Sequence, residues 1–451
     1  MANIKYLTID YANIKKYIAQ GYIEVLKLAN NINKYTIVKQ IKNYFWIKWM
    51  LKEELNILKH VRVVNLSMPK VFAIDNYAFE NNKYLVKIMA PNVEYIGEEA
   101  FLNCYSLKKV ELINTKTIAK AAFQNCRSLR NINLKNAENI DDYAFKNCHL
   151  LNRIIMPNIN QIGASVFENT IFLHKLLKYN AQNLAIFNGI LIGAKNVKDH
   201  LLLPDEIKII SGEVFENCHS LMTLIAPNVI EIGQWAFSGC KNLTNVEMPK
   251  VRKIGVNAFS ECQSLININI HKATEINDLA FNNCLNLKNI KLDNIEKIGI
   301  NVFNNTEFLK FLIADHPQNL AIINGILIDA KTAKADLILN KNVKIINDIA
   351  FKNNQYLTSI TMPNVIKIGN HAFENCQSLF KIVAPQTIEI GYLAFADNVS
   401  LQFVEISVIK KINFNAFKNV KLTYQNLKLP HRITEDKFNE MIKSETILDK
   451  K

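Results

Sequence analysis

The chain has 451 residues, more than one ordinary globular domain holds comfortably, and 49% of them are hydrophobic. It contains only 13 glycines and 10 prolines, which excludes a collagen-like or proline-rich segment. The net charge of +14 is compatible with an acidic partner, nucleic acid or an anionic membrane surface, although solubility alone also explains it.

Residues 1–65 form a basic N-terminal segment with 11 basic and 4 acidic residues. Within it, the spacing of apolar residues predicts a helix over 42–60. One face of this helix carries Ile47, Leu51, Leu55 and Leu58. We expect the helix to cap the first coil of the following repeats. Its aromatic and basic residues would also suit a helix lying on a membrane surface.

Residues 66–420 are built from a 22-residue repeat. Each repeat carries an Ala-Phe or Val-Phe pair, and its phenylalanine is called the anchor below. The anchors are 22 residues apart within three groups and 48 residues apart between groups, so a 136-residue super-repeat encloses the smaller one. The three groups of anchors are Phe79, Phe101, Phe123, Phe145 and Phe167; Phe215, Phe237, Phe259, Phe281 and Phe303; and Phe351, Phe373, Phe395 and Phe417.

The repeat at 357–376, LTSITMPNVIKIGNHAFENC, shows how one coil is expected to fold. Its first residues read as a strand that Pro363 ends, because proline cannot donate to a ladder. We expect Ile366 and Ile368 to point inward, Gly369 to turn the chain and Phe373 to fill the interior. So short a repeat cannot bury its own apolar side, and stacking of neighbours into a solenoid solves that problem.

Two spacers interrupt the repeats. The sequences QNLAIFNGILI (182–192) and QNLAIINGILI (318–328) place Asn188-Gly189 and Asn324-Gly325 between apolar runs. Asn-Gly in that setting is a strong signal for a tight hairpin. We therefore expect each spacer to be an elongated coil that carries a small hairpin.

Residues 421–451 are expected to form a C-terminal cap. Thr434 precedes the stretch EDKFNEMIK, which indicates an N-capped helix with acidic residues in its first turn. Its apolar side chains Phe438, Met441 and Ile442 would cover the last coil.

The repeat pattern LxxIxLPxxxxxIGxxAFxxCxxL resembles the BspA-like, Treponema-type leucine-rich repeats, and residues 243–262 (LTNVEMPKVRKIGVNAFSEC) fit it well. The resemblance covers about four fifths of the chain, from about 66 to 420. It implies a leucine-rich repeat solenoid, an α/β-type right-handed coil with parallel strands on one flank, closed by helical caps at both ends. Members of this family are often surface or host-interaction proteins, and some are adhesins.

All eight cysteines lie three residues after an anchor phenylalanine. They are Cys104, Cys126, Cys148, Cys218, Cys240, Cys262, Cys284 and Cys376. A line of thiols does not converge on a zinc ion, and no oriented base accompanies any of them. We therefore predict eight free, slow-reacting thiols that hydrogen-bond nearby backbone, and no catalytic, metal or cofactor residue.

The eighth residue after each anchor is expected to face outward from a strand, and we predict partner binding there. The candidate residues are the basic Lys87, Lys109, Arg153 and Lys175, followed by Asn245, Asn267, Asn289, Phe311 and Phe403. The alternative is that these are solvated strand residues, with asparagine serving as a cross-strand ladder. Nucleic acid is not expected, because stacking aromatics do not alternate with the basic residues.

The sequence has no glycine-rich phosphate loop, HExxH, GxSxG or paired-carboxylate signature, so we do not expect an enzyme. The predicted function is a monomeric protein-protein interaction scaffold whose ligand binds along the strand face. The alternative is a peripheral membrane or anionic-surface binder acting through residues 1–65. The sequence shows neither a signal peptide nor an apolar run long enough to span a membrane, which favours a cytoplasmic location, with non-classical export or a surface location as the alternative.

Overall fold

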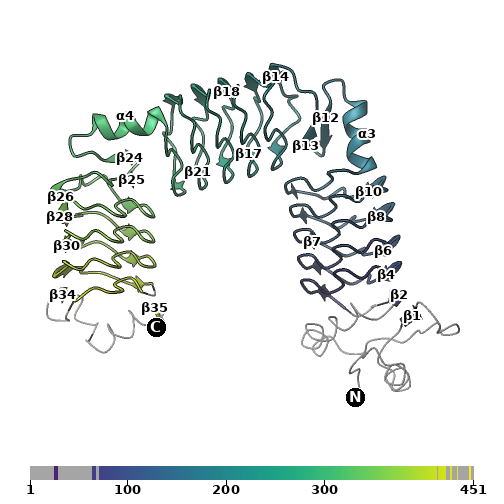
Figure 1. Ribbon diagram of the computed structural model, residues 1–451, viewed down its shortest axis with the longest axis horizontal. Helices are drawn as coiled ribbons and strands as arrows, with labels where there is room; N and C mark the ends of the chain where they lie inside the picture. The colour runs from purple at the N-terminus through teal and green to yellow at the C-terminus, as the bar shows by residue number, and fades with distance from the viewer. Residues whose placement is uncertain are drawn as a thin grey trace. The chain divides into compact units, whose positions relative to one another are not determined.

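The computed structural model describes residues 71–413 and 415–422 and the short segments 25–28, 63–67, 427–428, 434 and 446–447 (Figure 1). It contains two compact units. Unit 1 comprises Met1–Lys198, Pro204–Glu216 and Ile232–Ala236. Unit 2 comprises Asp199–Leu203, Asn217–Glu231 and Phe237–Lys451. The helices predicted at 42–60 and after Thr434 lie outside the described residues.

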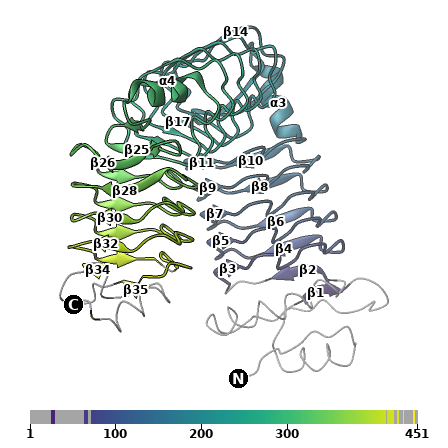
Figure 2. The ribbon, with the colours of Figure 1, turned by 60° about the vertical axis from the view of Figure 1, so that its left-hand side comes forward.

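Unit 1 is a stack of coils in which each coil contributes two short strands, one to each of two ladders (Figure 2). The wide ladder holds the strands that follow each anchor by about eight residues. It contains β2 (Val63–Ser67), β4 (Lys87–Met89), β6 (Lys109–Glu111), β8 (Asn131–Asn133) and β10 (Arg153–Ile155). The narrow ladder contains β3 (Ala73–Ile74), β5 (Tyr95–Ile96), β7 (Thr117–Ile118), β9 (Asn139–Ile140) and β11 (Gln161–Ile162).

Unit 2 repeats this plan in two groups of coils. Its wide ladders contain β14 (His200–Leu202), β16 (Thr223–Ile225), β18 (Asn245–Glu247), β20 (Asn267–Asn269) and β22 (Asn289–Ile290), then β26 (Ala335–Ile338), β28 (Leu357–Thr361), β30 (Lys381–Val383), β32 (Phe403–Glu405) and β34 (Leu427–Lys428). Its narrow ladders contain β19 (Lys253–Ile254), β21 (Glu275–Ile276) and β23 (Lys297–Ile298), then β27 (Ile345–Ile346), β29 (Lys367–Ile368), β31 (Glu389–Ile390) and β33 (Lys411–Ile412).

The strands of neighbouring coils pair in parallel and in register, so the predicted solenoid is confirmed. It carries parallel strands on two flanks, where one was expected. Near both ends of the chain, described segments form strands where helical caps were expected. The strand β1 (Val25–Leu28) pairs antiparallel with β2, and β35 (Thr446–Ile447) pairs antiparallel with β33.

The anchor phenylalanines stack into continuous columns inside the coils. Phe101 and Phe123, for example, are fully buried, and their ring centroids lie 4.9 Å apart with an interplanar angle of 7°. The spacing matches that of hydrogen-bonded strands, about 4.8 Å. One detail of the predicted coil is wrong, because Ile366 is 43% exposed while Val365 and Ile368 are fully buried. The chain turns between these two inward positions, so strict alternation does not hold there.

Both predicted hairpins are confirmed. In unit 1, β12 (Leu184–Phe187) pairs antiparallel with β13 (Ile190–Ala194), which continues in parallel onto β15 (Ile209–Ile210). In unit 2, β24 (Ala321–Ile323) pairs antiparallel with β25 (Ile326–Asp329). Asn188 and Gly189 have φ of 49° and 74°, and Asn324 and Gly325 have φ of 47° and 78°. Positive φ at both central residues is what a type I′ turn requires.

Each hairpin is preceded by a helix that the sequence pattern did not predict. The helix α3 spans Ile171–Tyr179, and α4 spans Glu307–Asp315. Their N-caps are Thr170 and Thr306, which stand at the position that cysteine holds in most other coils. A threonine at that position, followed by apolar residues at helical spacing, is the signal that could have revealed them.

Replacing Thr306 by alanine should lower the free energy of unfolding by about 1 to 2 kcal/mol, because it removes a buried N-cap. The hydroxyl accepts from the Leu309 amide at 3.1 Å and donates to the Phe303 carbonyl at 2.7 Å. Urea unfolding of the full chain measures the change. Thr306→Ser keeps both bonds and should lose much less stability; equal losses in the two variants would contradict the capping role.

Gly369 permits close approach between two coils. A Cβ atom placed on it would lie 2.5 Å from the backbone nitrogen of Asp348, closer than side chains approach in folded proteins. Its φ lies outside the left-handed region, so close approach, and not the predicted turn, explains why glycine stands there.

We expect Gly369→Ala to lower the free energy of unfolding by about 1 to 3 kcal/mol, because the coils must move apart to admit the methyl group. Gly193→Ala is the matched control. Its new Cβ would lie 3.0 Å from the end of the Leu173 side chain, which can move, and at an ordinary contact distance of 3.7 Å from the Cβ of Ala185. Denaturant midpoints of the two variants measure the difference. A Gly369→Ala midpoint no lower than that of Gly193→Ala would contradict the packing argument.

Candidate protein-interaction surface

The candidate surface is the wide face, which we define as the outward side chains at the seventh, eighth and tenth residues after each anchor. In β6 the central Val110 is buried, while Lys109 is exposed and Glu111 half-buried. The same alternation holds along the ladder, because successive side chains of a strand point to opposite sides. Parallel, in-register pairing therefore lines up outward side chains of neighbouring coils in columns.

Two of the predicted basic residues in unit 1 share one carboxylate. The Nζ atoms of Lys87 and Lys109 lie 3.3 and 2.8 Å from Oε1 of Glu111. The hydrogen bond from Lys109, and then that from Lys87, hold the pKa of Glu111 below its usual value. Lys87 and Lys109 are thus largely satisfied within the protein, whereas Arg153 is exposed and makes no ion pair with any residue that the structure describes.

Two further cations, which the sequence reasoning missed, stand beside this column. Lys108 and Arg130 occupy the seventh position after their anchors, both are exposed, and neither forms an ion pair within the described residues. The backbone amide of Arg153 donates to the Arg130 carbonyl at 3.4 Å, so these two arginines belong to neighbouring coils at the same level. Reading the seventh column along with the eighth would have found them.

Lys175 and Phe311 do not belong to the wide ladder, and their assignment to a strand column is wrong. Lys175 lies on α3 and Phe311 on α4, where its side chain is 64% exposed. In these two coils a threonine N-cap begins a helix where the other coils continue into a strand.

The asparagine column of unit 2 forms the cross-strand ladder that was the alternative interpretation. The Nδ2 atom of Asn267 donates to Oδ1 of Asn245 at 2.6 Å, and Nδ2 of Asn289 donates to Oδ1 of Asn267 at 2.5 Å. These side-chain amides therefore use part of their hydrogen-bonding capacity in contacts with each other.

Phe403 is half-buried, although the sequence predicted it to be exposed. The Nζ atoms of Lys381 and Lys428 lie 5.3 and 5.4 Å from its ring centroid, within cation–π range. The apolar surface of this group of coils comes instead from neighbouring residues, with Phe380 48% and Ile338 68% exposed.

The cysteine column is structural. Six of the buried thiols donate to the carbonyl of the anchor 25 residues earlier, for instance Cys104 to Phe79 at 3.1 Å and Cys376 to Phe351 at 3.0 Å. At the same position Asn354 donates to two backbone carbonyls, each at 2.8 Å. The predicted role in satisfying turn backbone is confirmed. Within the described residues, no group of three or more His, Cys, Asp or Glu side chains is placed to hold a metal ion.

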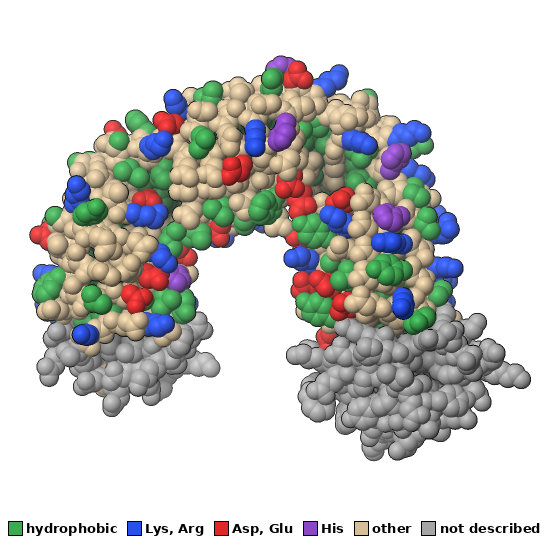
Figure 3. All heavy atoms as spheres, viewed as in Figure 1, with side chains coloured by type: hydrophobic (Ala, Val, Ile, Leu, Met, Phe, Trp, Pro, Cys, Tyr) green, Lys and Arg blue, Asp and Glu red, His purple; other side chains and the backbone are tan. Residues whose placement is uncertain are grey.

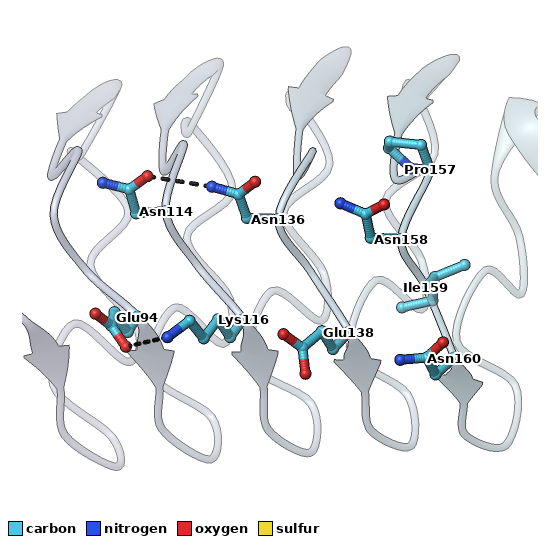
Figure 4. A pocket seen from close by; sticks show the side chains of 9 residues that line it. All are labelled: Glu94, Asn114, Lys116, Asn136, Glu138, Pro157, Asn158, Ile159 and Asn160. Carbon is cyan, nitrogen blue, oxygen red and sulfur yellow. Dashed lines mark hydrogen bonds and ion pairs between the residues drawn. The ribbon is translucent and has the colours of Figure 1, made fainter.

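A polar hollow of about 730 Å³ lies between two columns on unit 1 (Figure 4). One side is formed by an asparagine row in which Asn136 donates to Asn114 at 3.2 Å. On the other side Lys116 pairs with Glu94 at 2.8 Å. Most polar groups that line it are therefore already paired with each other, and the hollow is open to solvent, so it offers little to a small ligand.

The narrow ladder of unit 2 carries charges of alternating sign. Lys253 pairs with Glu231 at 2.9 Å, and Glu389 pairs with Lys411 at 3.3 Å and Lys367 at 3.6 Å. Alternation along the ladder leaves this flank close to neutral. The narrow ladder of unit 2 therefore offers no surface of a single charge sign.

This geometry defines a leucine-rich repeat solenoid. The chain belongs to the family of BspA type leucine-rich repeat regions, whose sequence profile matches residues 54–177, 195–318 and 330–443 with six copies. Repeat solenoids of this kind act as scaffolds that present extended recognition surfaces. Among the described residues, no helix is long and apolar enough to cross a membrane.

Many solved structures are similar to this chain, among them the following three. A leucine-rich cell surface protein from Faecalibacterium prausnitzii is 21% identical over 59% of this chain and 95% of its own, with a TM-score of 0.27. A leucine-rich repeat protein from Bacteroides ovatus is 19% identical over 84% and 85%, with a TM-score of 0.25. A leucine-rich repeat protein from Treponema pallidum is 19% identical over 56% of this chain and 91% of its own, with a TM-score of 0.22. A search of curated proteins gives no match.

Proposed function

We propose that this chain is a non-catalytic scaffold that binds a protein ligand across the wide face of its coils. The observation that carries the proposal is the contrast between the two sides of the wide ladder. Inward positions are uniformly aliphatic, as at Val110, Ile132 and Ile154, whereas outward positions change character from one group of coils to the next. The core needs no such variation, and extended faces of repeat proteins are their usual recognition surfaces.

The outward positions offer three kinds of contact. The coils of unit 1 present unpaired cations, the first coils of unit 2 present an amide ladder, and its last coils present apolar and aromatic side chains such as Phe380. Aromatic and arginine side chains are the residues that contribute most at protein interfaces. A role as a surface adhesin or host-interaction protein is the form of this function that the family suggests.

Affinity capture by the immobilised full chain tests the proposal, with matched variants on the wide face and away from it. The pairs are Arg153→Glu against Lys120→Glu, and Phe380→Arg against Ile366→Arg, each pair similarly exposed. We expect a captured protein that both control variants retain and at least one wide-face variant loses. If every captured protein bound the four variants equally, the wide face would not be the interface.

The basic N-terminal segment supports a second candidate function, attachment to an anionic membrane surface. Flotation of phosphatidylserine vesicles with the full chain and with a chain lacking residues 1–65 tests it. Loss of flotation on truncation would support this function. Absence of flotation by the full chain would remove it.

A further inference from the structure

The described coils of unit 1 separate their charges onto opposite flanks. Between the fourth and eighth positions after the anchors stand only basic charges, and the one carboxylate beside them is Glu111. After the anchors Phe79, Phe101, Phe123 and Phe145, the basic residues are Lys83, Lys87, Lys108, Lys109, Arg127, Arg130 and Arg153. The remaining positions of these coils, apart from Glu111, carry Asp75, Glu80, Glu94, Glu98, Glu99, Glu138, Asp141, Asp142 and Glu168 against Lys116, Lys120, Lys135 and Lys146. In Figure 3, on the coils that carry β4 to β10, red side chains gather along one edge and most blue ones along the other.

Three of these cations form a stripe without a counter-charge. The cationic stripe consists of Lys108, Arg130 and Arg153, which lie on three successive coils, are exposed, and make no ion pair within the described part of the chain. Neighbouring coils are about 4.8 Å apart, so the three positive charges repel one another. A bound anion would turn that repulsion into attraction.

The surroundings of the stripe favour carboxylates as that anion. Immediately beside it, Lys87 and Lys109 already hold the ionised Glu111 carboxylate at 3.3 and 2.8 Å. Two of the three residues in the stripe are arginines, whose planar guanidinium groups bind carboxylates through two parallel hydrogen bonds.

The same surroundings favour a polypeptide over nucleic acid. Tyr105 is 41% exposed beside the stripe, but the Arg127 guanidinium lies 5.0 Å from its ring centroid and covers a face on which a base would stack. Ile155, which follows Arg153 by two residues on β10, is 38% exposed and offers an apolar contact that a peptide side chain can use. A second copy of this chain is disfavoured because two chains of net charge +14 repel.

We propose that the cationic stripe of unit 1 binds an acidic polypeptide segment, with Lys108, Arg130 and Arg153 pairing with its carboxylates. The inference rests on the proposed function and specifies the chemistry of the ligand. In this proposal unit 1 attracts the ligand electrostatically. Such attraction speeds association, and it weakens as the salt concentration rises.

The test measures binding of labelled poly-L-glutamate to the full chain by fluorescence anisotropy. The stripe variant Lys108→Glu/Arg130→Glu/Arg153→Glu should bind at least about tenfold more weakly than the unmodified chain. The control variant Lys120→Glu/Lys272→Glu/Lys341→Glu changes the net charge equally at exposed sites and should stay within about twofold. Circular dichroism and the urea midpoint verify folding, and the milder Lys108→Gln/Arg130→Gln/Arg153→Gln variant replaces the first if it unfolds.

Three outcomes would overturn the inference. The first is that the unmodified chain does not bind poly-L-glutamate. The second is that the two charge-reversal variants lose affinity equally. The third is that the stripe variant binds poly-L-glutamate as well as the unmodified chain does. Oligothymidylate and phosphatidylserine vesicles are run in parallel, and tighter stripe-dependent binding of either would assign the stripe to that partner instead. A stripe variant that keeps the captured protein while Phe380→Arg loses it would leave the proposed function standing and remove only this inference.

Discussion

Replacing Phe259 by alanine is expected to lower the free energy of unfolding by about 3 to 5 kcal/mol. The side chain is fully buried, and its ring stacks between those of Phe237 and Phe281, with centroids 4.9 and 5.3 Å away and interplanar angles of 3° and 5°. Removing the ring opens a gap in the column. The gap cannot close, because the ladders on both flanks fix the distance between neighbouring coils.

Equilibrium urea unfolding of the full chain, followed by circular dichroism, measures this loss. Phe311→Ala is the matched control, because it removes the same ring from a side chain that is 64% exposed on α4. We expect the control to stay within about 0.5 kcal/mol of the unmodified chain. A Phe259→Ala variant as stable as Phe311→Ala would show that the anchor column does not support the coils.

The solenoid could be predicted because its core uses the same residue type at the same position in every coil. An anchor such as Phe123 has no partner within its own repeat, so only stacking can bury it. The hairpins could be predicted because Asn-Gly supplies two successive positive φ angles at low cost. In both cases a local pattern decides the structure.

The helices α3 and α4 could not be predicted from the repeat alone. Leu173 and Leu309 preserve the leucine six residues after the anchor, so the repeat pattern predicts that the strand register continues through both segments. One difference is the residue three after the anchor, which apolar residues at helical spacing follow in these two coils. A cysteine there donates to an earlier coil, whereas Thr170 and Thr306 accept from the amide three residues ahead and begin a helix.

The candidate surface could be predicted as a set of columns, but not as a set of free charges. Whether Lys109 is available to a ligand depends on Glu111, which lies two residues further along the same strand. Glu111 forms ion pairs with Lys109 and with Lys87 of the preceding coil. Phe403 was expected to be exposed and is covered by Lys381 and Lys428 from other coils. Such contacts depend on the conformations of long flexible side chains, and the residue types in a column do not specify those conformations.

Cys218 is expected to be the first of the eight thiols to react with a thiol reagent in the folded protein. It is half-buried, whereas the other seven are buried. Burial raises the pKa of Cys104 and of Cys376 to about 12, from an ordinary value of 9.0. At neutral pH this difference lowers the thiolate fraction by about 10³-fold, and the thiolate is the species that reacts.

The time course of reaction with Ellman's reagent measures these rates. We expect one rapid thiol, seven slow ones, and all eight reacting quickly in concentrated urea. Cys218→Ser should abolish the rapid phase, while Cys284→Ser, which removes a buried thiol of the same column, should leave it unchanged. A rapid phase that survived Cys218→Ser, or eight thiols reacting at one rate, would contradict the burial of the column.

The same pKa shifts predict a loss of stability at alkaline pH. The folded state raises the pKa of Cys104 and Cys376, so it favours the protonated thiols and binds protons more tightly than the unfolded chain. Their contribution is fully present below the unfolded pKa near 9 and is lost as pH rises from there toward 12. The urea midpoint should therefore fall above pH 9, and the slow thiols should react faster there both because more thiolate forms and because the coils open more often.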